Sequence, residues 1–566
     1  MTVIDGLNPA LILVCGSLLA LLAPQGRSRN LFMLALPVLG ALQLWSLPYG
    51  EHARVEAFGL TLTTLRLDGL SFAFALVFHI AALLAVIYAW GLRDPVQQVA
   101  GLLYPGAAVG AVLAGDLVTL FLCWELAAVS SVFLIWARRT RRAYRAGLRY
   151  LLAQVASGLL LLAGVIIRFR ATGSIAFGGL GLDSPGGGLI FVAFGIKAAF
   201  PLLHNWLQDA YPEATVTGAV VLSAFTTKMA VYALARGFAG TESLVAIGTL
   251  MAMFPIFYAV IENDLRRVLA YSMNNQLGFM VVGVGIGTPL ALDGAVAHAF
   301  ADILFKALLF MSMGAVLLRA GTVNGSELGG LYKSMPLTAG LCMVGAASIS
   351  AFPLFSAFAT KSLILEAAAR EGHWIPFLFL LFASAGVFHH AGIKIPYFAF
   401  FAHDSGIRCE EAPRHMLVAM GLAAALCVGI GVFPGALYAI LPYPVAFDPY
   451  TATHVITQLQ LLAWSALAFA LLVRTGVYPP ELRSVNLDFD WFYRKPLLAA
   501  AAGAWGAALR AWEGFNRLLE GSVERLIAAL ALHHGQRGIM AATWPTTRMV
   551  LWAVLLLGAC LIFYYL

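Results

Sequence analysis

Charged residues are scarce in this chain. They make up 11% of its 566 residues, whereas hydrophobic residues make up 61%. Soluble domains carry about 25% charged residues. The composition therefore excludes a soluble enzyme and indicates a polytopic helical membrane protein.

Cysteine pairs and nucleotide-binding loops are also lacking. The six cysteines contain no CxxC pair, and the chain has neither a Walker loop nor a GxGxxG loop. The glycines at 186–188 follow Ser-Pro, which favours a loop. The sequence therefore implies no cofactor and no metal or iron–sulfur site of its own, and any redox chemistry would belong to other subunits.

Long apolar runs dominate what is present, and each is long enough for a helix that crosses a bilayer. We expect an all-α polytopic membrane protein with about 14 core transmembrane helices, a C-terminal amphipathic helix and extra anchoring helices. The apolar segments lie at about 7–24, 30–47, 68–90, 98–115, 117–136, 147–167, 188–209, 216–236, 243–261, 268–287, 291–318, 336–369 (broken), 375–401, 415–434, 455–473 and 549–565.

The net charge of +7 follows membrane topology and does not indicate nucleic-acid binding. With the amino terminus outside, most loop arginines fall on the inner side, including the run from Arg138 to Arg149. That run is most simply an anchor for anionic lipid. We expect a multi-pass protein of the bacterial inner (plasma) membrane.

Six charged residues nevertheless lie inside the apolar segments, where a charge costs several kcal/mol or must find a partner. They are Glu125, Lys197, Lys228, Lys306, Lys361 and Lys394. One interpretation is that they only hold helices together. Six such sites in successive segments favour the other interpretation, that the protein moves charge through the membrane.

Two apolar segments are interrupted by proline. Pro201 and Pro353 each lie in a Phe-Pro-Leu triplet, with a lysine nearby. Proline should kink or unwind each helix. Interrupted helices at corresponding places in two halves predict inverted repeats with an ion path at the breaks, although a packing kink is the alternative.

We therefore divide the chain into N-terminal helices, two five-helix repeats, C-terminal helices, a surface segment and an anchor. Their expected limits are 1–97, 98–237, 243–401, 402–474, 475–548 and 549–566.

Four motifs resemble a known family: Ile196–Ala214 (IKAAFPLLHNWLQDAYPEA), Phe225–Arg236 (FTTKMAVYALAR), Asp264–Phe279 (DLRRVLAYSMNNQLGF) and Gly392–Phe401 (GIKIPYFAFF). They resemble the antiporter-like subunits of respiratory complex I and of Mrp-type cation/proton antiporters. Within that superfamily they are most similar to the D-type Mrp subunits. The resemblance covers residues 60 to 435.

The resemblance implies a relay of ionisable residues across the membrane plane. Glu125 corresponds to the glutamate on the fifth helix, and Lys197 to the lysine of the first broken helix, with His204 beside it. The remaining implied positions are Lys228, His298, the central Lys306, Lys361 of the second broken helix, and Lys394. His389 and His390 either join the relay or pack at an interface.

Two positions depart from the family pattern. Tyr211 stands where complex I relatives have a histidine, which agrees with the Mrp D branch. Asp302 stands where many relatives have a histidine, one helical turn before Lys306. We expect Asp302 to be the charge partner of Lys306 and to stabilise its charged form.

A switch is expected between Glu125 and Lys197. A buried lysine loses proton affinity by desolvation and regains it when a carboxylate approaches. Forming and opening this pair would therefore move a proton.

The tail carries an apolar stripe from Ala508 to Leu530 at spacings of three and four, opposite a charged face. This predicts an amphipathic surface helix, and the final segment would anchor it. A surface helix without a coupling role is the simpler interpretation.

The sequence thus predicts an ion-translocating membrane subunit of a hetero-oligomeric Mrp-type antiporter, exchanging protons for a monovalent cation such as Na⁺, with no covalent chemistry of its own. Its expected partners are other membrane subunits, the lipid bilayer, protons and Na⁺, and not nucleic acid. Two alternatives are a proton-pumping subunit of a complex I or membrane-bound hydrogenase type redox complex, and the membrane coupling subunit of an inorganic-carbon uptake complex.

Overall fold

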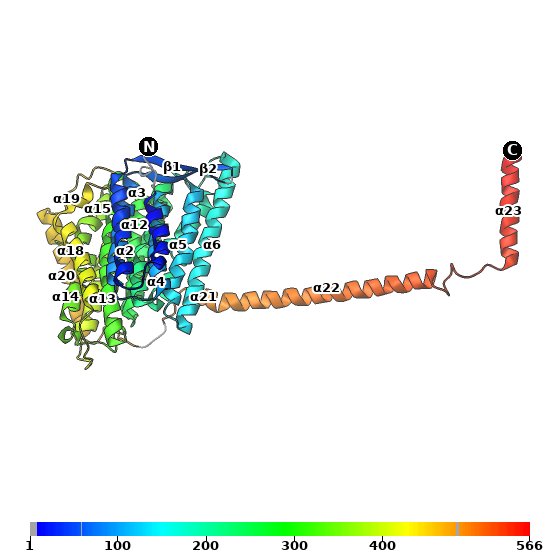
Figure 1. Ribbon diagram of the computed structural model, residues 1–566. Helices are drawn as coiled ribbons and strands as arrows, with labels where there is room; N and C mark the ends of the chain where they lie inside the picture. Colours follow the sequence, from blue (N-terminus) through cyan, green and yellow to red (C-terminus); the bar gives the residue numbers. More distant parts are fainter. Residues whose placement is uncertain (1–7, 58, 483–485) are drawn as a thin grey trace. The chain divides into compact units, whose positions relative to one another are not determined.

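The computed structural model describes residues 8–57, 59–482 and 486–566. The chain forms two compact units, residues 1–486 and 487–566. In the first unit, helices of the blue-to-yellow part of the chain run side by side (Figure 1). Each of the sixteen expected apolar segments contains one helix or a helix pair, and the expected all-α class is confirmed.

Eleven helices among the described residues are long and apolar enough to cross a membrane. The unbroken helices of the first unit are α1 (Pro9–Leu19), α2 (Arg27–Ser46), α3 (Gly69–Tyr88), α4 (Pro95–Leu113), α5 (Leu117–Trp136), α6 (Arg141–Thr172), α11 (Glu242–Ile261), α12 (Leu265–Ile286), α13 (Pro289–Ala320), α18 (Arg414–Val432), α19 (Pro434–Tyr438) and α20 (Ala452–Arg474). The interrupted ones are α7 (Gly187–Lys197) with α8 (Asn205–Ala210), α9 (Val216–Ala224) with α10 (Thr226–Gly237), α14 (Pro336–Ile349) with α15 (Ser356–Arg370), and α16 (Trp374–Val387) with α17 (Lys394–Pro396).

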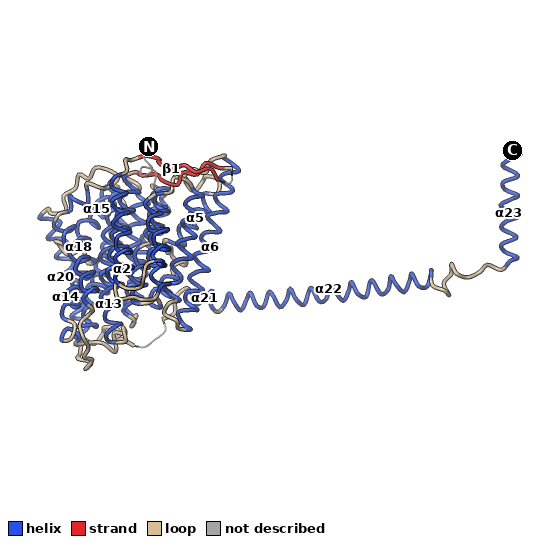
Figure 2. Tube along the Cα trace, viewed as in Figure 1, coloured by secondary structure: helices blue, strands red, loops and turns tan. Residues whose placement is uncertain are grey.

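Two antiparallel strands, β1 (Gly50–Ala57) and β2 (Leu60–Leu67), form a hairpin over one end of the helices (red in Figure 2). The apolar-segment pattern did not predict this hairpin. Its signal is the alternation of leucine and polar residues in β2, of which Leu62, Leu65 and Leu67 are buried. We call this end of the first unit the hairpin face.

Both Phe-Pro-Leu triplets interrupt their helices in the same way. The backbone turns through the left-handed region at Ala199 (φ 61°) and Leu202 (φ 72°) in the first break, and at Ala351 (φ 57°) and Leu354 (φ 75°) in the second. Alanine and leucine rarely adopt this conformation, which costs about 1–2 kcal/mol per residue. The two helix breaks therefore have the same backbone conformation, with one left-handed residue on each side of the Phe-Pro pair.

Aspartates begin equivalent helices in the two halves. Asp116 caps α5 and Asp264 caps α12, each accepting two backbone N–H groups of the first turn. Each also forms an isolated antiparallel bridge, Asp116 with Ala176 and Asp264 with Asn324. Asp116 accepts from Thr63 N of the hairpin at 2.7 Å, so this end of α5 lies at the hairpin face.

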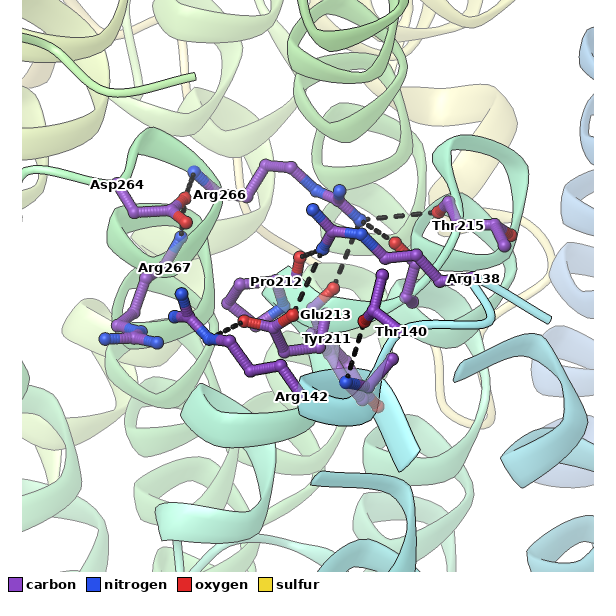
Figure 3. Close-up of polar contacts among 12 residues, drawn as sticks. Arg138, Thr140, Arg142, Tyr211, Pro212, Glu213, Thr215, Asp264, Arg266 and Arg267 are labelled. Atoms are coloured by element: carbon purple, nitrogen blue, oxygen red, sulfur yellow. Dashed lines mark hydrogen bonds and ion pairs between the residues drawn. The ribbon is translucent and has the colours of Figure 1, made fainter. Parts of the chain in front are cut away.

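Several arginines lie close together just beyond the opposite end of α5 (Figure 3). Arg138, just beyond α5, and Arg142 both contact Glu213, at 3.3 and 2.7 Å. Arg266, in the first turn of α12, is buried and donates to the carbonyls of Tyr211 and Ala214 at 3.2 and 3.0 Å. We call this end the arginine face.

The start of α12 therefore lies at the face where α5 ends, and the two halves run in opposite directions. This is the arrangement expected of inverted repeats.

The second unit contains α21 (Asp490–Arg494), α22 (Pro496–His534) and α23 (Thr546–Tyr565). The whole stripe from Ala508 to Leu530 lies on α22, a single uninterrupted helix. α23 is long and apolar enough to span a membrane.

The strained breaks give a stability prediction. Ala199→Gly should be neutral or stabilising, because the relief of about 1–2 kcal/mol of strain offsets the roughly 0.5–1 kcal/mol entropic cost of glycine. The neighbouring Ala198→Gly, at φ −75°, relieves no strain and should lower the apparent melting temperature in detergent. Equal effects at the two positions would show that the strain is absent.

Candidate functional site

Glu125 lies near the middle of α5 and faces α6. Its Oε1 atom is buried and has no hydrogen-bond partner among the described residues. Gly158 of α6 makes room for it, because a Cβ atom at position 158 would lie 1.7 Å from Glu125 Oε1. The glycine thus makes room for the Glu125 carboxylate between α5 and α6.

Lys197 is the last residue of α7, at the first break. Its Nζ donates to the carbonyl of Trp124 at 2.7 Å and lies 4.4 Å from the centroid of the Trp124 ring. The indole is itself fixed by its donation to Ser157 Oγ at 2.9 Å. Lys197 and Glu125 are close enough to interact electrostatically. In this state the ammonium is nevertheless held by a carbonyl and a ring, and not by the carboxylate.

His204 lies across the same break, immediately before α8. Its ring is buried and lies 4.6 Å from the ring of Phe254 on α11. The break therefore places a lysine at one helix end and a histidine at the other.

Asp302 on α13 forms an ion pair with Lys228 of α10, with 2.6 Å between Oδ2 and Nζ, and both side chains are fully buried. The direct ion pair therefore goes to Lys228 and not, as expected, to Lys306, although Asp302 still interacts electrostatically with Lys306. Lys228 also donates to the carbonyl of Ser223 at 3.1 Å, at the end of α9. The interruption between α9 and α10 lets the lysine reach across to α13, whereas Lys306 turns toward α12.

One face of α12 supplies partners to the groups beside it. Ser272, Gln276 and Phe279 are spaced by four and three residues, so they lie on the same side of the helix. Ser272 Oγ accepts from Lys306 Nζ at 2.6 Å, and Gln276 Oε1 lies 3.0 Å from His298 Nε2.

The third member of that face, Phe279, lies beneath Lys361, whose Nζ is 4.9 Å from the ring centroid. Lys361 also donates to the carbonyl of Ile349, the last residue of α14, at 3.3 Å. His298 Nδ1 lies 3.1 Å from the hydroxyl of Thr360, the neighbour of Lys361. Polar contacts thus connect α12, α13 and the second broken helix.

The central charges are not balanced. Lys228, Lys306 and Lys361 are buried, and among the described residues Asp302 is the one carboxylate that interacts with them. Three buried ammonium groups opposite one carboxylate would leave two charges uncompensated. These lysines and His298 lie close enough together to interact electrostatically as one group.

Lys394 lies in a distorted part of its span, between two π-helical turns at Phe388–Ile393 and Tyr397–Phe401. Its Nζ contacts three oxygens: the carbonyls of Val260 and Glu262, at 2.7 and 2.6 Å, and Glu481 Oε1, at 2.8 Å.

The two histidines before Lys394 differ. His390 is fully buried, and its ring interacts with the backbone carbonyl of Gly386. It interacts electrostatically with both Lys306 and Lys394. His389 packs its ring on Tyr478, with 5.5 Å between centroids.

The structure thus arranges the predicted residues in three groups. The first contains Glu125, Lys197 and His204 around the first break. The second contains Lys228, His298, Asp302, Lys306 and Lys361. The third contains His390 and Lys394.

Several contributing residues were not predicted: Gly158, Ser272, Gln276, Thr360 and Glu481. The four-residue spacing of Ser272 and Gln276 parallels that of His298, Asp302 and Lys306 on α13 and is a usable signal. Gly158 and Glu481 contact the site from a helix and a segment distant in sequence, and Thr360, although it neighbours Lys361, contacts His298 of another helix; no local pattern marks these three.

Residues 114–389 match the family described as NADH:quinone oxidoreductase/Mrp antiporter, TM. The chain is 30% identical to NAD(P)H-quinone oxidoreductase chain 4 1 of Synechococcus sp. (strain JA-3-3Ab), over 73% of this chain and 86% of that protein. It is 31% identical to the A/B component of a probable K(+)/H(+) antiporter of Rhizobium meliloti, over 68% and 42% of the two chains.

The D component of an Na(+)/H(+) antiporter of Alkalihalophilus pseudofirmus is also 31% identical, over 47% of this chain and 58% of that protein. The chain spans about half the length of these two antiporter relatives. Its fold matches a chain of the Mrp complex from Dietzia sp. DQ12-45-1b with a TM-score of 0.74 and 24% identity, over 98% of this chain and 62% of that chain.

The partner of Asp302 can be identified by double-mutant cycles. Removing one member of a buried ion pair costs about 3–5 kcal/mol, whereas replacing both with apolar residues is close to neutral. Asp302→Leu should therefore destabilise the protein, and adding Lys228→Met should restore most of the loss. Adding Lys306→Met instead should restore less.

The measurement is unfolding in detergent for the single and double variants, from which the two coupling energies are obtained. A larger coupling of Asp302 to Lys306 than to Lys228 would contradict the ion pair seen in the structure.

Proposed function

Because the chain belongs to the NADH:quinone oxidoreductase/Mrp antiporter transmembrane family, we propose that it is the proton-translocating subunit of a multi-subunit Na⁺/H⁺ antiporter in a bacterial plasma membrane. Its partners in this proposal are other membrane subunits. The relatives named as antiporter components support the activity. The Alkalihalophilus relative supports Na⁺ as the cation, whereas the Rhizobium protein is named for K⁺.

The observation that carries the proposal is the unbalanced group around Asp302. Three buried lysines and a histidine share a single carboxylate, so a charge arriving at one of them repels charge on the others. Ser272, Gln276 and Thr360 provide hydrogen-bonding groups between them. In this proposal, the shared carboxylate favours transfer of a proton between these groups over its retention on one of them.

In this proposal, the group formed by Glu125, Lys197 and His204 provides a switch at one end of the proton path. Glu125 is unpaired and Lys197 rests on the Trp124 carbonyl, which is the open arrangement of the pair. Closing the pair would stabilise the ammonium form of Lys197, and opening it would release a proton toward the central group. In the open arrangement, the Trp124 carbonyl holds the lysine.

A redox-linked role is the second candidate. The quinone oxidoreductase chain is covered over 86% of its length, more than the two antiporter relatives. A redox-driven complex would use the same relay with a different source of energy.

Mass spectrometry of the purified assembly separates the candidates. Small Mrp-type subunits support the antiporter, whereas quinone-site and iron–sulfur subunits would replace it with the redox role. A large zinc-binding soluble partner would instead indicate inorganic-carbon uptake.

The relay is tested by Glu125→Gln and by Lys197→Ala. Each variant should abolish Na⁺-dependent dissipation of a pH gradient in everted vesicles, because the switch loses one charge, while expression and assembly persist. Full exchange by either variant would remove these residues from the path. Comparing Na⁺ with K⁺ in the same assay identifies the cation.

A matched pair of glycine variants tests the position of the carboxylate. Gly158→Ala should displace the Glu125 side chain and slow exchange by about 10–100-fold, as small misplacements of reacting groups do. Gly101→Ala in α4 is the control, because a Cβ atom there meets nothing within 4 Å. Equal exchange rates for the two variants would show that the Glu125 position is unimportant.

A further inference from the structure

Lys394 differs from the other buried lysines in how fully it is held. Its ammonium contacts three oxygens, two backbone carbonyls and one carboxylate, and an ammonium has three protons to donate. By contrast, Lys306 donates to the hydroxyl of Ser272, and Lys197 and Lys361 each combine one carbonyl with an aromatic ring. A charged Lys394 side chain thus finds an oxygen acceptor for each of its three protons, and we call these three oxygens the lock.

The carboxylate that contacts Lys394 belongs to Glu481, which lies outside the membrane-spanning helices. Glu481 follows α20 in the segment that leads toward the second unit, and its side chain is 6% exposed. Tyr478, three residues earlier, fixes this segment against the span that carries Lys394. Its ring lies 5.5 Å from the ring of His389 and 6.1 Å from that of Phe398.

The other acid nearby is already occupied. Glu262 Oε1 accepts the backbone N–H groups of Asn263 and Asp264, and its Oε2 lies 3.8 Å from Arg267. Glu262 thus offers Lys394 its backbone carbonyl, while Glu481 supplies the carboxylate. Because these residues precede and begin α12, the lock lies at the arginine face.

We propose that Glu481 is the counter-ion that gates Lys394, so that Lys394 releases its proton at the arginine face only when the segment carrying Glu481 withdraws. The inference rests on the proposed function and names the regulation of one end of the same relay. Glu481 is in this view a positioning residue, which acts on the transported proton through Lys394.

The chemistry of Glu481 suits a reversible lock. Burial raises the pKa of its carboxyl above the ordinary value, while the Lys394 ammonium opposes this rise. The Lys394 ammonium therefore offsets part of the cost of burying the Glu481 charge, and this cost rises once the ammonium is lost. Loss of the proton from Lys394 thus favours the withdrawal of Glu481 to water.

Glu481→Gln in the full assembly tests the counter-ion. The glutamine keeps the volume but removes the charge, so Lys394 should give up its proton at lower pH. The pH profile of exchange should shift to lower pH by about one to three units, the range through which one nearby opposite charge acts. Glu481→Asp should restore most of the shift.

The control is Glu366→Gln, which removes an exposed carboxylate paired with Arg370. A purely structural role of Glu481 would lower the rate without moving the profile. A Glu481→Gln profile that superimposes on the parent profile would overturn the proposal.

A cross-link tests the gate itself. Phe398→Cys and Tyr478→Cys, in a chain whose six native cysteines are replaced, place two thiols on opposite sides of the contact. Joining them with a short bifunctional methanethiosulfonate should block exchange, and a reducing agent should restore it. Exchange that persists after complete cross-linking would show that the segment need not move.

The two proposals fail differently. If the parent assembly exchanges no cation for protons, the proposed function fails. If the parent exchanges and Glu125→Gln does not, but Glu481→Gln and the cross-link leave the pH profile and the rate unchanged, only the gate fails.

Discussion

The ion pair between Lys228 and Asp302 is the contact on which the centre of this protein depends. Both side chains are fully buried, 2.6 Å apart. The pair balances itself and leaves Lys306 and Lys361 without a carboxylate of their own. Charge on Lys306 or Lys361 is therefore only partly compensated, and this imbalance, which would destabilise an ordinary core, is the property that the proposed relay uses.

Backbone carbonyls hold three of the buried lysines. Lys197 uses Trp124, Lys361 uses Ile349 at the end of α14, and Lys394 adds Val260 and Glu262 to its carboxylate. A carbonyl carries a partial negative charge and is favourable for an ammonium, but it binds it less strongly than a carboxylate does. Interrupted helices expose such carbonyls inside a membrane, where lipid offers no hydrogen bonds. The break after α14 exposes the Ile349 carbonyl in this way.

The two ends of the proposed relay differ in how their charged side chains are held. Near the first break, an unpaired Glu125 lies against Gly158 and is available to Lys197. At the arginine face, Lys394 is saturated by three oxygens. One end is therefore open and the other closed in this state. This asymmetry is what directional transfer between two sides of a membrane requires.

The sequence by itself determined the helical membrane class, the charged residues at membrane depth and the two breaks. Hydrophobicity and the missing amide of proline are local properties, readable at Glu125 or Pro201 without knowing any neighbour. The hairpin before α3 was not predicted because its strands are short and only half buried.

The tertiary structure alone decided which oxygen atom each lysine ammonium contacts. Asp302 lies one turn from Lys306, yet its partner is Lys228, because side-chain direction and a neighbouring broken helix outweigh closeness along the chain. Ser272, Thr360 and Glu481 reach their partners from helices or segments far away in sequence, and only packing brings them there.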